Sequence, residues 1–129
     1  MTAVFVFDRD GDLNLFADLG DAEGWLEAVD VERGEYSHVF LHDGTVVQLG
    51  TSGETVALEP GADHDHARLQ SLIFDYQCRV PGAPRTVVPL DFADQWLQQE
   101  WEARRPKRPA WLAHWLHGSA PKQVDGDDL

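Results

Sequence analysis

The sequence predicts an α+β fold: an antiparallel β-meander of about five strands, in the order ββαβββα, packed by helices. Two observations predict the sheet. Short β-branched and aromatic runs occur in the first 60 residues, and Asp-Gly pairs separate such runs at residues 10–11 and 43–44. Because short hairpins join sequential strands, the sheet is expected to be antiparallel. A third observation, the helical periodicity beyond residue 62, predicts helices that cover it.

The strands are expected at residues 3–8, 12–16, 37–42, 45–50 and 55–59. Between the second and third strands, Asp21 is expected to cap a short helix, because its side chain can accept a hydrogen bond from a free backbone N–H of the first turn. Trp25, Leu26 and Val29 would share one face of this helix, and we expect that face to pack on the sheet.

The second half of the chain predicts three more helices. The first covers residues 63–80, with Asp63 as its cap and the proline-containing segment 81–84 as its end. The next begins at Asp91, and a short fourth helix over residues 108–118 ends at Gly118. The chain therefore reads as a single domain over residues 1–118, with a core at 1–80 and a Trp-rich helical extension at 81–118. Residues 119–129 are expected to be a disordered tail.

Three aspartates around the first Asp-Gly pair raise the alternative of a calcium loop. Asp8, Asp10 and Asp12 match the first ligands of an EF-hand. However, Leu13 stands where the loop needs its glycine, and Leu19 stands where it needs a bidentate glutamate. The stretch therefore predicts a two-residue hairpin turn with solvated flanks.

The charge of the chain is acidic and unevenly distributed. The 129 residues have a formal net charge of −13; residues 1–78 contain 16 acidic and 3 basic residues, and residues 79–129 contain 7 of each. Such a field repels nucleic acid and anionic lipid, so neither is an expected partner, whereas a basic protein is. The single cysteine, Cys78, excludes an internal disulfide and suits a reducing compartment, and no apolar stretch is long enough for a membrane span. We expect a cytoplasmic protein.

The segment DAEGWLEAVDVERGEY at 21–36, followed by Asp43-Gly44, is similar to a group of small acidic bacterial proteins. Those proteins share an AExxLEAxDVxxGEY core and are associated with the immunity partners of polymorphic toxin systems. The resemblance spans residues 4–76 and leaves the Trp-rich part unmatched. The matching residues are Ala22, Glu23, Leu26, Glu27, Ala28, Asp30, Val31, Gly34, Glu35 and Tyr36. The resemblance implies a shared fold and, for function, a toxin domain as the partner.

No catalytic residue, metal site or cofactor is predicted. The serines lack the context of a nucleophile elbow, and no phosphate-binding loop is present. The histidines form three close pairs along the chain: His38 with His42, His64 with His66, and His114 with His117. His64 and His66 have Asp63 and Asp65 nearby but would diverge at the start of a helix, and His38 and His42 would lie about 13 Å apart on a strand. His114 and His117 have no third ligand nearby in the sequence, so surface histidines are the favoured interpretation for all three pairs.

Two features predict recognition. The first is an acidic run around the short helix, consisting of Asp18, Asp21, Glu23, Glu27, Asp30, Glu32 and Glu35. Glu23 and Glu27 would repel each other at i, i+4 spacing, which a basic partner would relieve, although a solvated surface explains the same pattern. The second is the tryptophan pair Trp111 and Trp115, expected on one face of the last helix, where they either pack on the sheet or anchor an interface.

These features predict a non-enzymatic protein-binding module. Its expected task is immunity-type neutralisation: the acidic surface would steer a basic toxin domain into a complex that masks the toxin's site. Two alternatives stay open. One is a structural module that self-associates, as a homodimer, through the Trp-rich C-terminal helices. The other is a small domain that binds a metal or another ligand through its histidines.

Overall fold

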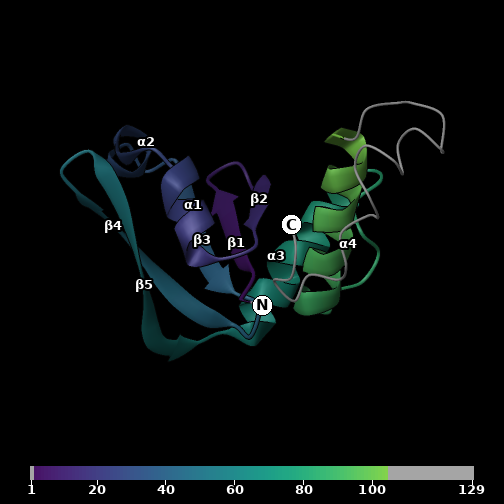
Figure 1. The fold of residues 1–129 in the computed structure, drawn as a ribbon. Coiled ribbons are helices and arrows are strands. Elements are labelled where there is room, and N and C mark those ends of the chain that lie inside the picture. The colour runs from purple at the N-terminus through teal and green to yellow at the C-terminus, as the bar shows by residue number, and fades with distance from the viewer. Residues whose placement is uncertain (1, 105–129) are drawn as a thin grey trace.

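The α+β fold is confirmed in the computed structural model, which describes residues 2–104. Within these residues, five strands form one antiparallel sheet, and helices pack against it (Figure 1). The strands are β1 (Val4–Asp8), β2 (Leu13–Phe16), β3 (Tyr36–Leu41), β4 (Thr45–Ser52) and β5 (Thr55–His64). The helices are α1 (Leu19–Trp25), α2 (Ala28–Glu32), α3 (His66–Arg79) and α4 (Pro89–Arg104).

The strand order in the sheet is β2-β1-β3-β4-β5. Strands β3, β4 and β5 are consecutive neighbours, as in a meander. The first hairpin, however, is placed so that β1 rather than β2 pairs with β3, with Phe5 opposite Phe40. Strand β1 is therefore internal, and β2 and β5 form the two edges.

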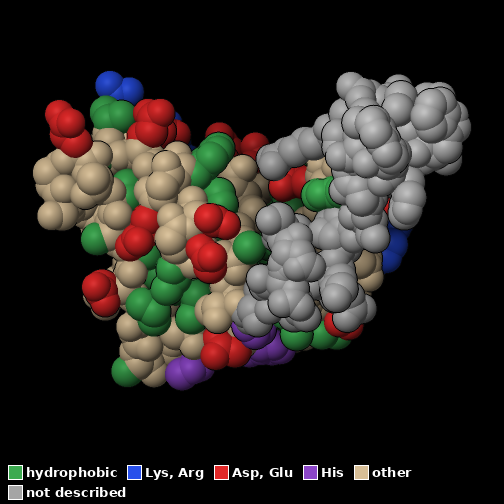
Figure 2. Space-filling view, viewed as in Figure 1, with side chains coloured by type: hydrophobic (Ala, Val, Ile, Leu, Met, Phe, Trp, Pro, Cys, Tyr) green, Lys and Arg blue, Asp and Glu red, His purple; other side chains and the backbone are tan. Residues whose placement is uncertain are grey.

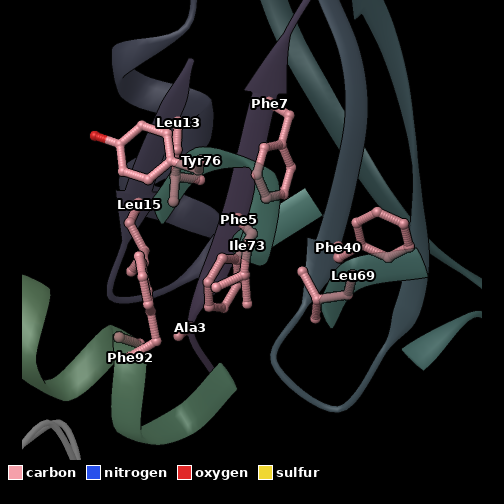
Figure 3. Close-up of a cluster of buried hydrophobic side chains, with 11 residues drawn as sticks. Ala3, Phe5, Phe7, Leu13, Leu15, Phe40, Leu69, Ile73, Tyr76 and Phe92 are labelled. Atoms are coloured by element: carbon pink, nitrogen blue, oxygen red, sulfur yellow. The ribbon is translucent and has the colours of Figure 1, made fainter. Parts of the chain in front are cut away.

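Helices cover both faces of the sheet. Alternate residues of β1 point to opposite faces, and all four residues from Val4 to Phe7 are buried. On one face, Phe5 and Phe7 pack with Leu69 and Ile73 of α3 (Figure 3). The same cluster includes Phe92 of α4, whose ring centroid lies 6.1 Å from that of Phe5.

The opposite face forms a second apolar cluster under α1 and α2. Val4 and Val6 pack there with Ala22 of α1 and with Leu26, which follows α1. Strands β4 and β5 contribute Val47, Val56 and Leu58 to this cluster. The two clusters leave β1 buried from both sides, which explains its unbroken apolar sequence.

The segment between β2 and β3 forms two short helices where one was expected. The cap of α1 is Asp18, not Asp21: a carboxylate oxygen of Asp18 accepts a hydrogen bond from the N–H of Asp21 at 2.8 Å. The backbone then turns extended at Leu26 before α2 begins. As a result, only Leu26 of the three reaches the core, and the prediction that all three pack on the sheet is wrong: Val29 is exposed, and Trp25 contacts the sheet only at its edge, with its ring centroid 5.5 Å from that of Phe16 in β2. The exposed fractions of Trp25 and Val29 are 56% and 45%.

The later helices also begin at other residues than expected. Strand β5 continues to His64, so Asp65 rather than Asp63 caps α3, accepting a hydrogen bond from the N–H of Arg68 at 3.0 Å. Helix α4 begins at Pro89, two residues before Asp91, since proline suits the first turn of a helix. The predicted helix over 108–118 and the predicted tail over 119–129 lie outside the described residues.

The first hairpin is a turn, as predicted, although its loop holds four residues rather than two. The carboxylate of Asp8 accepts hydrogen bonds from the N–H groups of Asp10 and Asp12, both at 2.9 Å. Gly11 has a φ of 87°, and its carbonyl oxygen accepts a hydrogen bond from Arg79 of α3. The Asp8 carboxylate thus fixes the turn.

The second hairpin, between β3 and β4, is a three-residue loop that ends at Gly44. One carboxylate oxygen of Asp43 accepts hydrogen bonds from the N–H and the Oγ1 hydroxyl of Thr45, at 2.9 and 2.7 Å. These bonds, first of all the one from the hydroxyl, lower the pKa of the Asp43 carboxyl.

None of the helices within residues 2–104 is long and apolar enough to cross a membrane.

Candidate functional site

The seven acidic residues of the predicted binding surface have different contacts in the structure. Asp18 and Asp21 lie at the start of α1, where Asp18 is occupied as a cap. Both carboxylates face the positive end of the helix dipole, which accounts for their position without a partner. The position of Asp18 and Asp21 is thus explained by α1 itself, in contrast to that of the acidic residues that follow the helix.

Glu23 has a structural role that the sequence did not indicate. One of its carboxylate oxygens accepts a hydrogen bond from the N–H of Leu58 at 2.8 Å, across 35 residues of sequence. Leu58 lies in the edge strand β5, so this bond satisfies a backbone group that the ladder with β4 leaves free. Glu23 therefore ties α1 to the far edge of the sheet.

Glu27, Asp30 and Glu35 converge on Tyr36, the first residue of β3. Burial raises the pKa of the Tyr36 hydroxyl, and Asp30, Glu27 and Glu35 raise it further through their negative charges. Glu35 is also paired with Arg9, at 3.3 Å between a guanidinium nitrogen and a carboxylate oxygen. Its charge is thus partly compensated, whereas neither Asp30 nor Glu27 forms an ion pair with another residue of the range 2–104.

Glu27 and Glu32 also line a shallow cavity between α2 and the turn that joins β4 to β5. We call this the α2 cavity; its volume is about 430 Å³, and it is lined by Leu26, Glu27, Ala28, Val29, Glu32, Gly53 and Glu54. Three glutamates therefore surround an apolar floor that includes the exposed side chain of Val29. Figure 2 shows acidic and hydrophobic side chains interspersed over the side of the molecule that carries α1 and α2.

Glu54 is the member of this cavity that the sequence did not indicate. It lies 19 residues beyond Glu35 and reaches α2 because β4 and β5 form a long hairpin, of eight and ten residues, that curls past the helices (Figure 1). The predicted strands at 45–50 and 55–59 already place Glu54 in the turn between them, but nothing in the sequence placed that turn beside α2. Nothing else in the sequence marks a glutamate in a Ser-Gly-Glu turn as part of a binding surface.

The tryptophans are only partly described. Trp111 and Trp115 lie outside the described residues. Trp96 packs inside the fold: its ring lies 5.7 Å from Tyr76 and 6.0 Å from Phe92, measured between centroids.

The histidines that the structure describes do not form a metal centre. No group of three or more metal-ligating side chains occurs within residues 2–104. His38 stacks on Phe40, with ring centroids 6.1 Å apart, and burial lowers the pKa of its imidazole, as does the charge of Arg68. His64 and His66 are exposed, and the third pair lies outside the described part of the chain.

Comparison with known proteins gives no relative. No protein-family model matches the chain, and no curated protein and no solved structure is similar to it. The chemistry of the surface is therefore the basis for a functional proposal.

Proposed function

We propose that this protein is a non-enzymatic protein-binding module that neutralises a basic partner, and that the partner is a toxin domain. The observation that supports this most is the α2 cavity. Glu27, Glu32 and Glu54 surround an apolar floor, and no basic residue is among its described lining. The chain also has a net charge of −13, carried by its first 78 residues.

The cavity combines the two requirements of a charge-steered interface. Negative charge attracts a basic partner at a distance and accelerates encounter. An exposed apolar side chain such as Val29 can then be buried in contact, which slows dissociation. A lysine or arginine side chain suits such a site, because its aliphatic stem packs on the floor while its charge meets the glutamates.

Neutralisation would follow from steric masking. A complex centred on the α2 cavity places the long β4–β5 hairpin beside the partner, which extends the covered area beyond the cavity itself. This mechanism needs no catalytic group on the present chain. It requires only that the bound surface of the toxin domain overlaps the path of its substrate.

The test uses the basic C-terminal domain of a toxin encoded beside this protein and measures the association rate by stopped-flow fluorescence. We expect Glu27→Lys/Glu32→Lys to slow association about tenfold or more at low salt, and salt to slow the wild type in the same way. The control is Asp63→Lys/Asp75→Lys, which changes the net charge equally at exposed positions of β5 and α3.

The control should change the rate by less than about threefold, because its charges are far from the cavity. Equal effects of the two double variants would show that only net charge matters, and would remove the α2 cavity from the mechanism. An absence of complex with the wild type at low salt would refute the proposed function as a whole.

A further inference from the structure

The outer face of α3 carries a regular pattern of exposed residues. On the inner face of this helix, Leu69, Ile73 and Tyr76 belong to the core cluster that α3 forms with the sheet (Figure 3). On the outer face, residues recur at spacings of four, three and four, which places them in one stripe along the helix. The stripe consists of Ala67, Ser71, Phe74 and Cys78, and all four residues are exposed.

This spacing is that of the seam of a coiled coil, two heptads long. Phe74 is the large residue of the seam, and it is 57% exposed. Ala67 and Ser71, the two seam residues before it, are small. A second helix of the same sequence that runs in the opposite direction would therefore offer small side chains opposite Phe74.

The segment between α3 and α4 adds apolar surface along one flank of the seam. The side-chain amide of Gln77 donates to the carbonyl of Pro84 at 2.8 Å. That of Gln70 donates to the carbonyl of Val87 at 3.5 Å. Phe74 lies between the two glutamines in the sequence, so the segment runs past it, and Val87 is itself 38% exposed.

The other flank of the seam carries one charge of each sign. Arg68 and Asp75 are seven residues apart, so they lie on the same side of the helix, about 10 Å apart along its axis. Both are exposed, and neither forms an ion pair with another residue of the range 2–104. Arg68 lies in the first turn of α3, where the helix dipole disfavours a cation, so α3 alone does not explain its position.

We infer that the outer face of α3 is an interface with a second copy of this chain, in which the two α3 helices pack antiparallel about a two-fold axis. In an antiparallel pair of this kind the same flank of both helices meets. If the axis passes between residues 71 and 72, Arg68 of each copy lies opposite Asp75 of the other. A parallel pair would bring Arg68 beside the glutamine flank instead, and would leave both charges without a partner.

The distribution of charge favours a second copy over a basic partner at this face. The acidic residues of the α2 cavity lie beside α2, which packs on the face of the sheet opposite to α3. Helix α3 itself contains two arginines and one aspartate, so a basic partner gains nothing there. Repulsion between the acidic surfaces of two copies is screened beyond about 8 Å at physiological ionic strength.

The interface is small, and the dimer should be weak. A pair of helices of 14 residues corresponds to the low end of interface sizes, so we expect a dissociation constant on the order of 0.1 mM. At the micromolar concentrations of a stopped-flow measurement the chain would be monomeric, so dimerisation does not disturb the test of the proposed function. The inference goes beyond that function, because it concerns a different surface and a different partner.

Cysteine crosslinking of the full chain tests the register. Ser71 lies next to the proposed axis, so Ser71→Cys/Cys78→Ser should form an intermolecular disulfide under mild oxidation, which requires the two Cα atoms to approach within about 7 Å. The wild type is the matched control, because Cys78 is exposed on the same face. The two copies of Cys78 would lie about 20 Å apart along the helices, so the wild type should stay uncrosslinked.

Sedimentation equilibrium measures the strength of the dimer. Phe74→Ser should weaken it more than about tenfold, because the apolar contact is lost. Arg68→Asp and Asp75→Arg should each weaken it about tenfold, because the two-fold axis places two like-charged pairs in the interface. The double variant Arg68→Asp/Asp75→Arg exchanges the two charges and should return to within about threefold of the wild type. Glu27→Lys/Glu32→Lys should dimerise as the wild type does, which separates this test from that of the proposed function.

Four results would overturn the inference. A chain that is monomeric at about 1 mM has no such dimer, and nuclear Overhauser effects between Phe74 and residues 105–129 in that monomer would assign the face to the chain's own C-terminal segment. A dimer that Phe74→Ser leaves unchanged uses another surface. A double charge variant as weak as the single ones would show that the two charges do not meet. Crosslinking of the wild type, without crosslinking of Ser71→Cys/Cys78→Ser, would exclude the proposed axis.

Discussion

Three glycine-to-alanine replacements should change the stability of this protein by different amounts and in different directions, although the chemical change is the same. Gly44 is the most constrained. Its φ is +92°, and a Cβ atom there would lie 2.9 Å from the Cα and 3.0 Å from the backbone nitrogen of His66. These atoms belong to the first turn of α3 and cannot move as a side-chain tip can. The carbonyl of Gly44 also accepts a hydrogen bond from the N–H of Asp65, the cap of α3, at 2.9 Å.

A replacement at Gly53 separates the two contributions to the loss of stability at Gly44, which are the strain of a positive φ and the steric contact with α3. The φ of Gly53 is +65°, but a Cβ atom there meets nothing within 4 Å. Gly53→Ala should therefore show the backbone penalty alone, about 1–2 kcal/mol. Gly44→Ala adds the displacement of the α3 backbone, which as a case of overpacking costs a further 1–3 kcal/mol or so, for a total of about 2–5 kcal/mol.

Gly24 should give the opposite sign. It has no positive φ and lies inside α1 with open space around its Cα. Gly24→Ala should raise the free energy of unfolding by about 0.5–1 kcal/mol, because alanine is the better helix former.

Urea denaturation followed by tryptophan fluorescence measures the free energy of unfolding of all three variants. A loss for Gly44→Ala that equals that for Gly53→Ala within about 0.5 kcal/mol would refute the argument that the contact with α3 is rigid.

Two further predictions concern single hydrogen bonds. Thr45→Val should lower the free energy of unfolding by about 1 kcal/mol at neutral pH, because it removes a donor to the Asp43 carboxylate. This stabilisation is present above the pKa of the Asp43 carboxyl in the unfolded chain, about 3.9, and is lost as the pH falls through the lower pKa of the same carboxyl in the folded protein. The free energies of unfolding of the wild type and of Thr45→Val should therefore converge in acid. A constant difference between them across pH would contradict this prediction. Glu23→Ala should lower stability by about 1–2 kcal/mol and speed amide exchange at Leu58, and unchanged exchange there would show that the bond contributes little.

The sequence was sufficient for those parts of the fold that local chemistry decides. The Asp-Gly turns place their glycines at positive φ, and the apolar runs located all five strands, although β5 continues to His64, beyond its predicted end at residue 59. The position of β1 between β2 and β3 could not be read in this way. Both neighbours are antiparallel to it, and the choice depends on burying Val4 to Phe7 from two sides at once, which is a property of the assembled layers.

The candidate site was predictable only in composition. The acidic residues around α1 and α2 were identified, but their roles depend on contacts that span long stretches of chain. Glu23 bonds to a strand 35 residues away, and Glu54 joins the α2 cavity through the length of a hairpin. Neither distance in space follows from a local pattern.

The internal position of β1 has a consequence for how the chain folds during synthesis. Strand β1 is made before β3, its partner on one side, and well before α3 and α4, which cover Phe5 and Phe7. Until residue 41 has been made, the Val-Phe-Val-Phe segment can pair only with β2, and an isolated hairpin is marginally stable in water. An exposed apolar segment of high β-propensity is a site of aggregation. Slow translation through residues 17–35 would therefore lengthen the time that the nascent chain is most in need of a chaperone.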